Sequence, residues 1–119
     1  MPVRSLSSSI FKWPDAHTVL SAVSKWAAQI AQSNPAILKV GCFGSYARGD
    51  WGAGSDVDIL ILVKESDLPF ESRALQWDAN HLPVPADVIV YTLEEWKDLQ
   101  QKNASTRKMA AETHWLFER

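Results

Sequence analysis

The chain of 119 residues has little cysteine and no long apolar run. Its single cysteine, Cys42, cannot form an internal disulfide, and its place at the end of an apolar stretch is typical of a small buried side chain. The longest purely apolar runs are far shorter than the roughly 20 residues of a membrane-spanning helix, and the N-terminal residues lack the continuous apolar region of a signal peptide. We therefore expect a cytoplasmic protein that is neither exported nor embedded in a membrane.

An excess of basic charge is also absent. The chain has 12 Lys and Arg residues against 14 Asp and Glu residues, and its formal net charge is -2. This balance provides no electrostatic footprint for non-specific binding to nucleic acid, so we expect no nucleic-acid partner. With 46% hydrophobic and 22% charged residues the composition is that of a globular protein. The length predicts one domain over residues 1–119, in which residues 1–13 show no clear period.

Apolar residues recur at helical or strand spacing along most of the chain. Behind an N-cap at Asp15, a stripe with steps of three and four residues predicts an amphipathic helix that ends near Ser33. Stretches rich in apolar and β-branched residues predict three strands, and the second is apolar on both faces and therefore central. These strands are expected at residues 36–43, 57–63 and 87–91.

The remaining segments give weaker signals. Residues 64–85 allow one short helix after a helix entry at residues 67–69, and the capping box at Thr92 and Glu95 predicts a helix toward Gln101. Residues 104–112 are predicted to be helical. Residues 115–117 form either an edge strand or a contact with a partner.

The direction of the strands follows from where the polar groups lie along the chain. Gly44 ends the first strand, whereas Asp58 and Asp87 begin the second and third. These residues can meet only if the first strand runs antiparallel to the other two. The connection between the second and third strands is long enough for the crossover that parallel neighbours require. We therefore predict the α/β (α+β) class, with a small mixed sheet and flanking helices.

The stretch from Gly44 to Asp58 combines two kinds of chemistry. Gly44 and Ser45 lie where a strand gives way to a turn, a place where free backbone N–H groups can hold phosphate. Side chains alternate along a strand, so Asp56 and Asp58 project from one face, and the predicted sheet places Asp87 beside them. Three such carboxylates repel one another unless a cation binds, and ligands that are all oxygen favour Mg²⁺ or Mn²⁺ over zinc.

This spacing resembles that of the minimal nucleotidyltransferases of the DNA polymerase β superfamily. The signature of that superfamily is Gly-Ser, ten residues, then Asp-x-Asp, which Gly44, Ser45, Asp56 and Asp58 meet. The longer form, Gly-Ser-x-Ala-Arg-Gly, five residues, Ser-Asp-x-Asp, is also met without a gap. The resemblance implies a polymerase-β-like fold and metal-dependent transfer of a nucleoside monophosphate, AMP from ATP above all, to a hydroxyl group.

The resemblance also implies a role for each site residue. Asp56 and Asp58 would ligate two Mg²⁺ or Mn²⁺ ions, and Asp87 would complete the catalytic metal site near the acceptor hydroxyl. Gly44 and Ser45, with neighbouring backbone amides, would hold the terminal phosphates of ATP. Arg48 would either contact phosphate or brace the loop by pairing with an acidic side chain. We favour bracing, because Arg48 lies within a tight turn.

The acceptor is expected to come from another molecule. Larger relatives carry a helical domain that helps to bind the acceptor, and 119 residues leave no room for one. In the minimal family the usual companion is a helical HEPN-type protein, and the pair resembles a toxin and an antitoxin that adenylylates it. That is our leading hypothesis. The alternatives are a non-catalytic subunit that neutralises or scaffolds a helical partner, and a stand-alone enzyme that modifies a small hydroxylated molecule.

Overall fold

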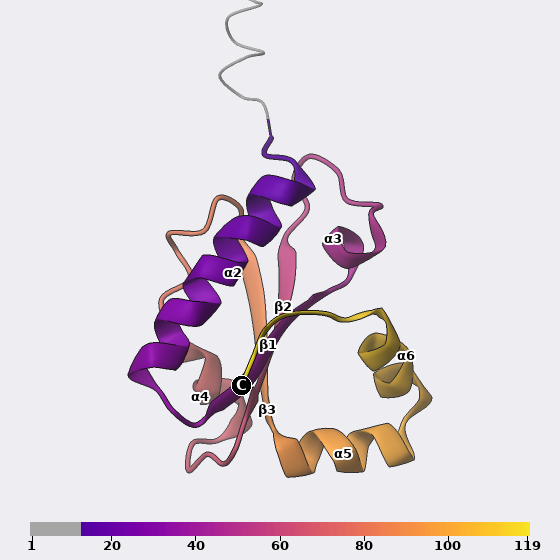
Figure 1. The fold of residues 1–119 in the computed structure, drawn as a ribbon. Helices are drawn as coiled ribbons and strands as arrows, with labels where there is room; N and C mark the ends of the chain where they lie inside the picture. Colours follow the sequence, from indigo (N-terminus) through magenta and orange to yellow (C-terminus); the bar gives the residue numbers. More distant parts are fainter. Residues whose placement is uncertain (1–12) are drawn as a thin grey trace, which may run out of the picture.

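The computed structural model describes residues 13–119, so most of the segment 1–13 lies outside the described residues. In Figure 1, one long helix covers one face of a sheet, and two helices lie on the other side. The elements follow the predicted order. They are α2 (Ala16–Ser33), β1 (Ile37–Phe43), α3 (Ser45–Arg48), β2 (Val57–Val63), α4 (Phe70–Arg73), the 3-10 turn η1 (Ala74–Gln76), β3 (Ala86–Thr92), α5 (Leu93–Lys102), α6 (Ala104–Glu112) and β4 (His114–Glu118).

The four strands form one mixed sheet in the order β3-β2-β1-β4. β1 runs antiparallel to β2 and to β4, whereas β2 and β3 are parallel. The predicted strand directions are therefore confirmed. The apolar stretch 115–117 lies in β4, an edge strand that pairs with β1, so the edge strand expected there is confirmed. In the parallel pair, Asp58 lies directly opposite Asp87.

The sheet separates two groups of buried side chains. Alternate residues of β2, such as Ile59 and Ile61, pack with the buried stripe of α2. Leu60 and Leu62 point to the opposite face, where they pack with Trp96 of α5. Because side chains alternate along a strand, Asp58 shares the second face with these leucines. The carboxylate therefore lies on the side of the sheet where α5 and α6 lie.

The helix α2 has the boundaries that its sequence predicts. The backbone N–H of Thr18 donates to Asp15 Oδ1 over 2.8 Å, which caps the first turn, and the last residue is Ser33. Trp26, in the buried stripe, donates from Nε1 to the carbonyl of Asp78 over 2.9 Å and so ties α2 to the segment before β3. None of the helices between residues 13 and 119 combines the length and the apolar character that a membrane span requires.

A buried arginine joins the short helix α4 to the start of α5. Arg73 is 6% exposed and pairs in a bidentate manner with Glu95, with nitrogen–oxygen distances of 2.6 and 3.1 Å. Its guanidinium also donates to the carbonyls of Leu68 and Val90. Glu95 completes the predicted capping box with Thr92. These bonds to the Arg73 guanidinium and to Thr92 lower the pKa of Glu95 from its usual value near 4.5 to about 2.

The pair of Arg73 and Glu95 should make the free energy of unfolding depend on pH under acidic conditions. Because the pKa of Glu95 is lower in the folded state, its contribution is complete above about pH 4.5 and is lost as pH falls toward about 2. Water screens the pair, since the Glu95 side chain is 42% exposed, so we expect Glu95→Gln to cost about 1 kcal/mol at pH 7 and almost nothing at pH 2. Urea denaturation at a series of pH values measures this.

The neighbouring Glu94→Gln variant is the matched control for Glu95→Gln. Glu94 lies in the same first turn of α5 but is exposed and does not contact Arg73 in the described structure. Glutamine at position 95 can still serve in the capping box, so the cap itself is preserved. Equal pH dependence for the wild type and the Glu95→Gln variant would contradict the assigned role of the pair.

Candidate functional site

The site begins at Gly44, where β1 ends. Gly44 is buried and has a φ of 76°, in the left-handed region that favours glycine, and it precedes the single turn of α3. A Cβ atom at this position would collide with Asp58 Oδ2. The turn between β1 and α3 therefore lies directly against the carboxylate of β2. The two halves of the sequence motif, separated by ten residues, are in contact.

The three predicted carboxylates lie at one end of the β2 and β3 strands. Asp58 is half-buried and opposite Asp87, whereas Asp87 and Asp56 are exposed. Burial raises the pKa of Asp58 most, and the negative charges of Asp87, Asp56 and Glu112 raise it further, while the charge of Arg48 lowers it. The side chains thus form one electrostatic group, in which the ionised state of Asp58 is disfavoured.

The three carboxylates have donor chemistry that suits a divalent cation. The donors are all carboxylate oxygens, and none of the three side chains has a hydrogen-bond donor among residues 13–119. The repulsion that raises the pKa of Asp58 is the kind that a bound cation relieves. In the described structure, however, no three His, Cys, Asp or Glu side chains converge into a preformed metal cluster. The donor chemistry fits Mg²⁺ or Mn²⁺, and binding would require the exposed Asp56 and Asp87 to turn toward Asp58.

Arg48 braces the loop. Its Nε lies 3.1 Å from Asp50 Oδ2, and one terminal nitrogen lies 3.3 Å from Glu112 Oε1. The same Glu112 oxygen accepts a hydrogen bond from the backbone N–H of Gly44 over 3.1 Å. Sequence reasoning had left two roles open for Arg48, and the structure places it in ion pairs. The sequence does not point to Glu112, because its neighbours in the predicted helix do not distinguish it from any other surface glutamate.

Aromatic side chains support the loop that joins α3 to β2. Trp51 is stacked on Tyr46, with ring centroids 5.4 Å apart and planes 9° apart. The Tyr46 hydroxyl accepts a hydrogen bond from Trp13 Nε1 over 2.8 Å and donates to the carbonyl of Ser55. Trp51 is thus packed on one face. The loop that leads to Asp56 is held against α3.

Cys42 is the titratable residue buried next to the site. It is fully buried in β1, and burial, together with the nearby charge of Asp58, raises the pKa of its thiol to about 12. The thiol therefore stays protonated at physiological pH and cannot act as a nucleophile. The interpretation of Cys42 as a small buried hydrophobic residue is confirmed.

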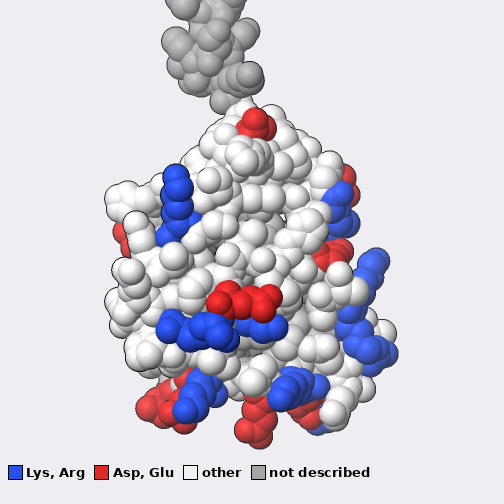
Figure 2. All heavy atoms as spheres, in the orientation of Figure 1, with Lys and Arg blue, Asp and Glu red and all other residues white. Residues whose placement is uncertain are grey.

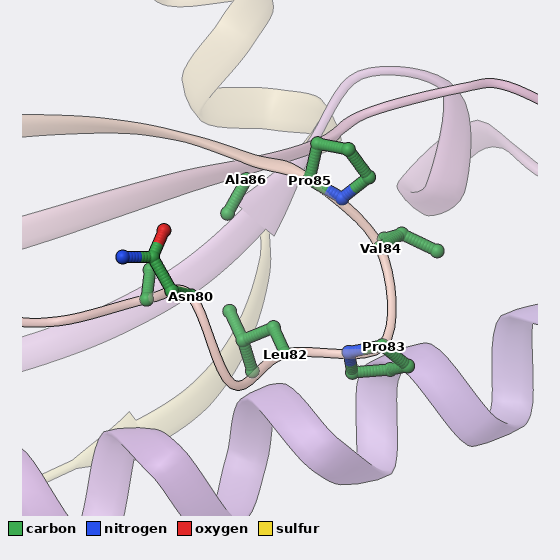
Figure 3. A pocket seen from close by; sticks show the side chains of 7 residues that line it. Asn80, Leu82, Pro83, Val84, Pro85 and Ala86 are labelled. Atoms are coloured by element: carbon green, nitrogen blue, oxygen red, sulfur yellow. The ribbon is translucent and has the colours of Figure 1, made fainter.

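A hollow of about 410 Å³ lies where the chain turns toward β3, and Figure 3 shows the side chains that line it. Its lining is apolar except for Asn80 and carries no titratable side chain, so it cannot perform acid–base or metal chemistry. On the face shown in Figure 2, basic and acidic side chains lie side by side, and no continuous basic patch is visible.

Comparison with known proteins agrees with the geometry. The family model described as the nucleotidyltransferase domain matches residues 24–111. A protein of Methanocaldococcus jannaschii, provisionally named a protein adenylyltransferase, is 44% identical over 48 residues, which are 40% of this chain and 48% of that protein. The match thus spans about half of the relative.

Two solved structures were also found. The crystal structure of a provisionally assigned nucleotidyltransferase from Sulfolobus solfataricus has a TM-score of 0.64 at 22% identity, and the match covers 87% of this chain and 84% of that one. It shows that the two chains share a fold, and the predicted small mixed sheet with flanking helices is confirmed. A toxin–antitoxin structure with AMP-PNP has a TM-score of 0.47 at 17% identity, covering 81% and 73% of the two chains.

Proposed function

Because the chain belongs to the nucleotidyltransferase domain family, we propose that it transfers AMP from ATP to a hydroxyl group of a protein partner. The observation that carries the proposal is the contact between Gly44 and Asp58, which brings the phosphate-binding half of the motif against its carboxylate half. In the reaction, the acceptor oxygen bonds to the α-phosphorus and the bond to the β-phosphate breaks. Pyrophosphate leaves, and the hydroxyl proton passes to a carboxylate or to water.

Each site residue has one role in this proposal. Asp56, Asp58 and Asp87 would hold two divalent cations, Mg²⁺ or Mn²⁺, which would supply activation of the acceptor hydroxyl and stabilisation of charge on the attacking and leaving oxygens. Ser45 and the adjoining backbone amides contact the terminal phosphates, since the Ser45 hydroxyl has no hydrogen-bond partner among residues 13–119.

The proposed acceptor is a helical protein of the HEPN type, which the chain would modify in the manner of an antitoxin. Two considerations support a protein acceptor. The partial relative from Methanocaldococcus jannaschii carries the name of a protein adenylyltransferase. In addition, Asp87 is exposed on the edge strand β3, where the side chain of a second protein can reach it.

Labelled ATP tests the proposed function. The protein is incubated with Mg²⁺, with the protein encoded beside it and with ATP that carries the label on either the α- or the γ-phosphate. We expect the α-label to appear on the neighbouring protein, to be lost when EDTA removes the cation, and to return when Mg²⁺ or Mn²⁺ is added in excess. Transfer of the γ-label, or no transfer at all, would contradict nucleotidyl transfer to this partner.

A further inference from the structure

We propose that Glu112 is a positioning residue of the nucleotide site, which holds the phosphate-binding turn in shape from the far end of the chain. This inference rests on the proposed function. Glu112 is the last residue of α6 and lies 68 positions after Gly44. Its carboxylate is half-buried, with 22% of the side chain exposed.

One oxygen of Glu112 joins the two ends of α3. Glu112 Oε1 accepts from the backbone N–H of Gly44, which precedes the first residue of α3, and from Arg48, which is the last residue. The Gly44 amide lies beyond the last paired residue of β1 and is buried, so without this acceptor it would lose a hydrogen bond that water cannot fully replace. A four-residue helix is not stable alone, and the two hydrogen bonds to Glu112 hold it at both ends.

The bonds to Glu112 leave the hydroxyl of Ser45, the first residue of α3, available. The backbone carbonyl of Ser45 accepts from Gly49 and Asp50, which closes the turn, but the Ser45 hydroxyl is not engaged by any residue of 13–119. Arg48 is already paired with Asp50 and Glu112. The polar side chain of α3 that remains to contact a phosphate is therefore that of Ser45, and its position depends on the two residues that Glu112 holds.

Glu112 is itself fixed by the way β4 packs on β1. The next residue, Thr113, is buried and donates from its hydroxyl to the carbonyl of Met109 over 2.7 Å. A Cβ atom at Gly41 of β1 would lie 2.6 Å from Thr113 Cγ2 and 2.8 Å from Trp115 Cε3, so the glycine permits close approach of the two strands. Gly41 lies three residues before Gly44 on the strand that delivers it. The acceptor, Glu112, and the Gly44 amide that donates to it are thus both held by the packing of the chain against β1.

Three substitutions at position 112 separate the effect of side-chain length from the effect of charge. Glu112→Ala removes the acceptor, and Glu112→Asp keeps the charge but shortens the side chain. Glu112→Gln keeps a carbonyl that can accept from both donors. We expect the KM for ATP and the equilibrium dissociation constant for ATP with Mg²⁺ to rise about tenfold in the Ala and Asp variants and less than about threefold in the Gln variant. The value of kcat should change less than about threefold, and the exposed Glu65→Ala variant is the control.

An NMR measurement on the protein without nucleotide tests the contact directly. We expect the backbone amide resonance of Gly44 and the terminal Nη resonances of Arg48, which report the two bonds to Glu112, to move in the Ala and Asp variants and to stay near their wild-type positions in the Gln variant. If Glu112→Ala does not fold, the Asp and Gln variants carry the same comparison. The measurement requires no catalytic activity.

The outcomes separate this inference from the proposed function. Failure of the wild type to bind ATP with Mg²⁺ would overturn the proposed function and, with it, the role of Glu112. Equal ATP affinity in the wild type, Ala and Asp variants would overturn the role of Glu112 alone. Tighter binding in the Ala variant would also overturn it, because the carboxylate would then be a competitor of phosphate for the Gly44 amide rather than its support.

Discussion

We expect Asp58→Asn to lose nucleotidyl transfer by about a thousandfold or more and yet to unfold at a temperature about 2 °C above that of the wild type. Activity falls because Asp58 is the carboxylate that touches the Gly44 turn and lies opposite Asp87. Stability rises because burial and neighbouring negative charges raise the pKa of Asp58, so its ionised form is costly. The gain is small, since the half-buried side chain is partly screened by water.

The pH dependence of this gain has a defined sign. A carboxyl group whose pKa is raised by folding destabilises the folded state when pH exceeds its ordinary value, which is 3.8 for Asp58. Below that pH, Asp58 is protonated in both states, and the stability difference between the wild type and Asp58→Asn should disappear. Thermal unfolding at pH 7 and at pH 3 measures the change in stability. Transfer of AMP from α-labelled ATP at pH 7 measures the loss of activity.

The matched control for Asp58→Asn is Asp67→Asn, an exposed carboxylate in the loop after β2. It should leave both activity and unfolding temperature unchanged. The same Asp58→Asn variant also distinguishes the enzyme from a non-catalytic binding subunit. If the variant binds the partner but no longer neutralises it, the chemistry is required. If it still neutralises the partner, contact suffices, and the proposal that AMP transfer is the mode of action is wrong.

The second large effect is expected at Gly44. Gly44→Ala should lower the free energy of unfolding by about 2–4 kcal/mol, because alanine is strained at a φ of 76° and its methyl group collides with Asp58 Oδ2. Nucleotidyl transfer should fall by about a hundredfold or more, since the turn and the carboxylate must separate. Urea denaturation and the α-label assay measure the two effects.

Gly49 provides a control with the same backbone requirement. Its φ is 86°, but a Cβ atom would meet nothing within 4 Å, so Gly49→Ala should cost only the strain of about 1 kcal/mol. Gly52 has neither a positive φ nor a neighbour within 4 Å, and Gly52→Ala should be nearly neutral. Equal costs at positions 44 and 49 would mean that contact with Asp58 does not require glycine.

Local sequence patterns predicted most of the elements and the contact between the two halves of the motif. The N-cap at Asp15 and the period of apolar residues placed α2 within a residue of its observed ends, and the capping box placed the start of α5. The helix predicted at residues 104–112 is observed as α6. The motif residues Gly44 and Asp58 were correctly expected to meet. These predictions succeed because helix caps, side-chain alternation and turn chemistry depend on residues that are close in sequence.

The sequence by itself therefore determined the long helices, the first three strands with their directions, and the family to which the motif belongs. Only the tertiary structure decided that β4 pairs with β1, that Arg48 bonds to Asp50 and Glu112, and that Glu112 reaches the Gly44 amide. The physical reason is that a short apolar strand or a surface glutamate can make many alternative contacts, and its local sequence does not select one of them. The partner is selected by packing and strand register between segments that lie tens of residues apart.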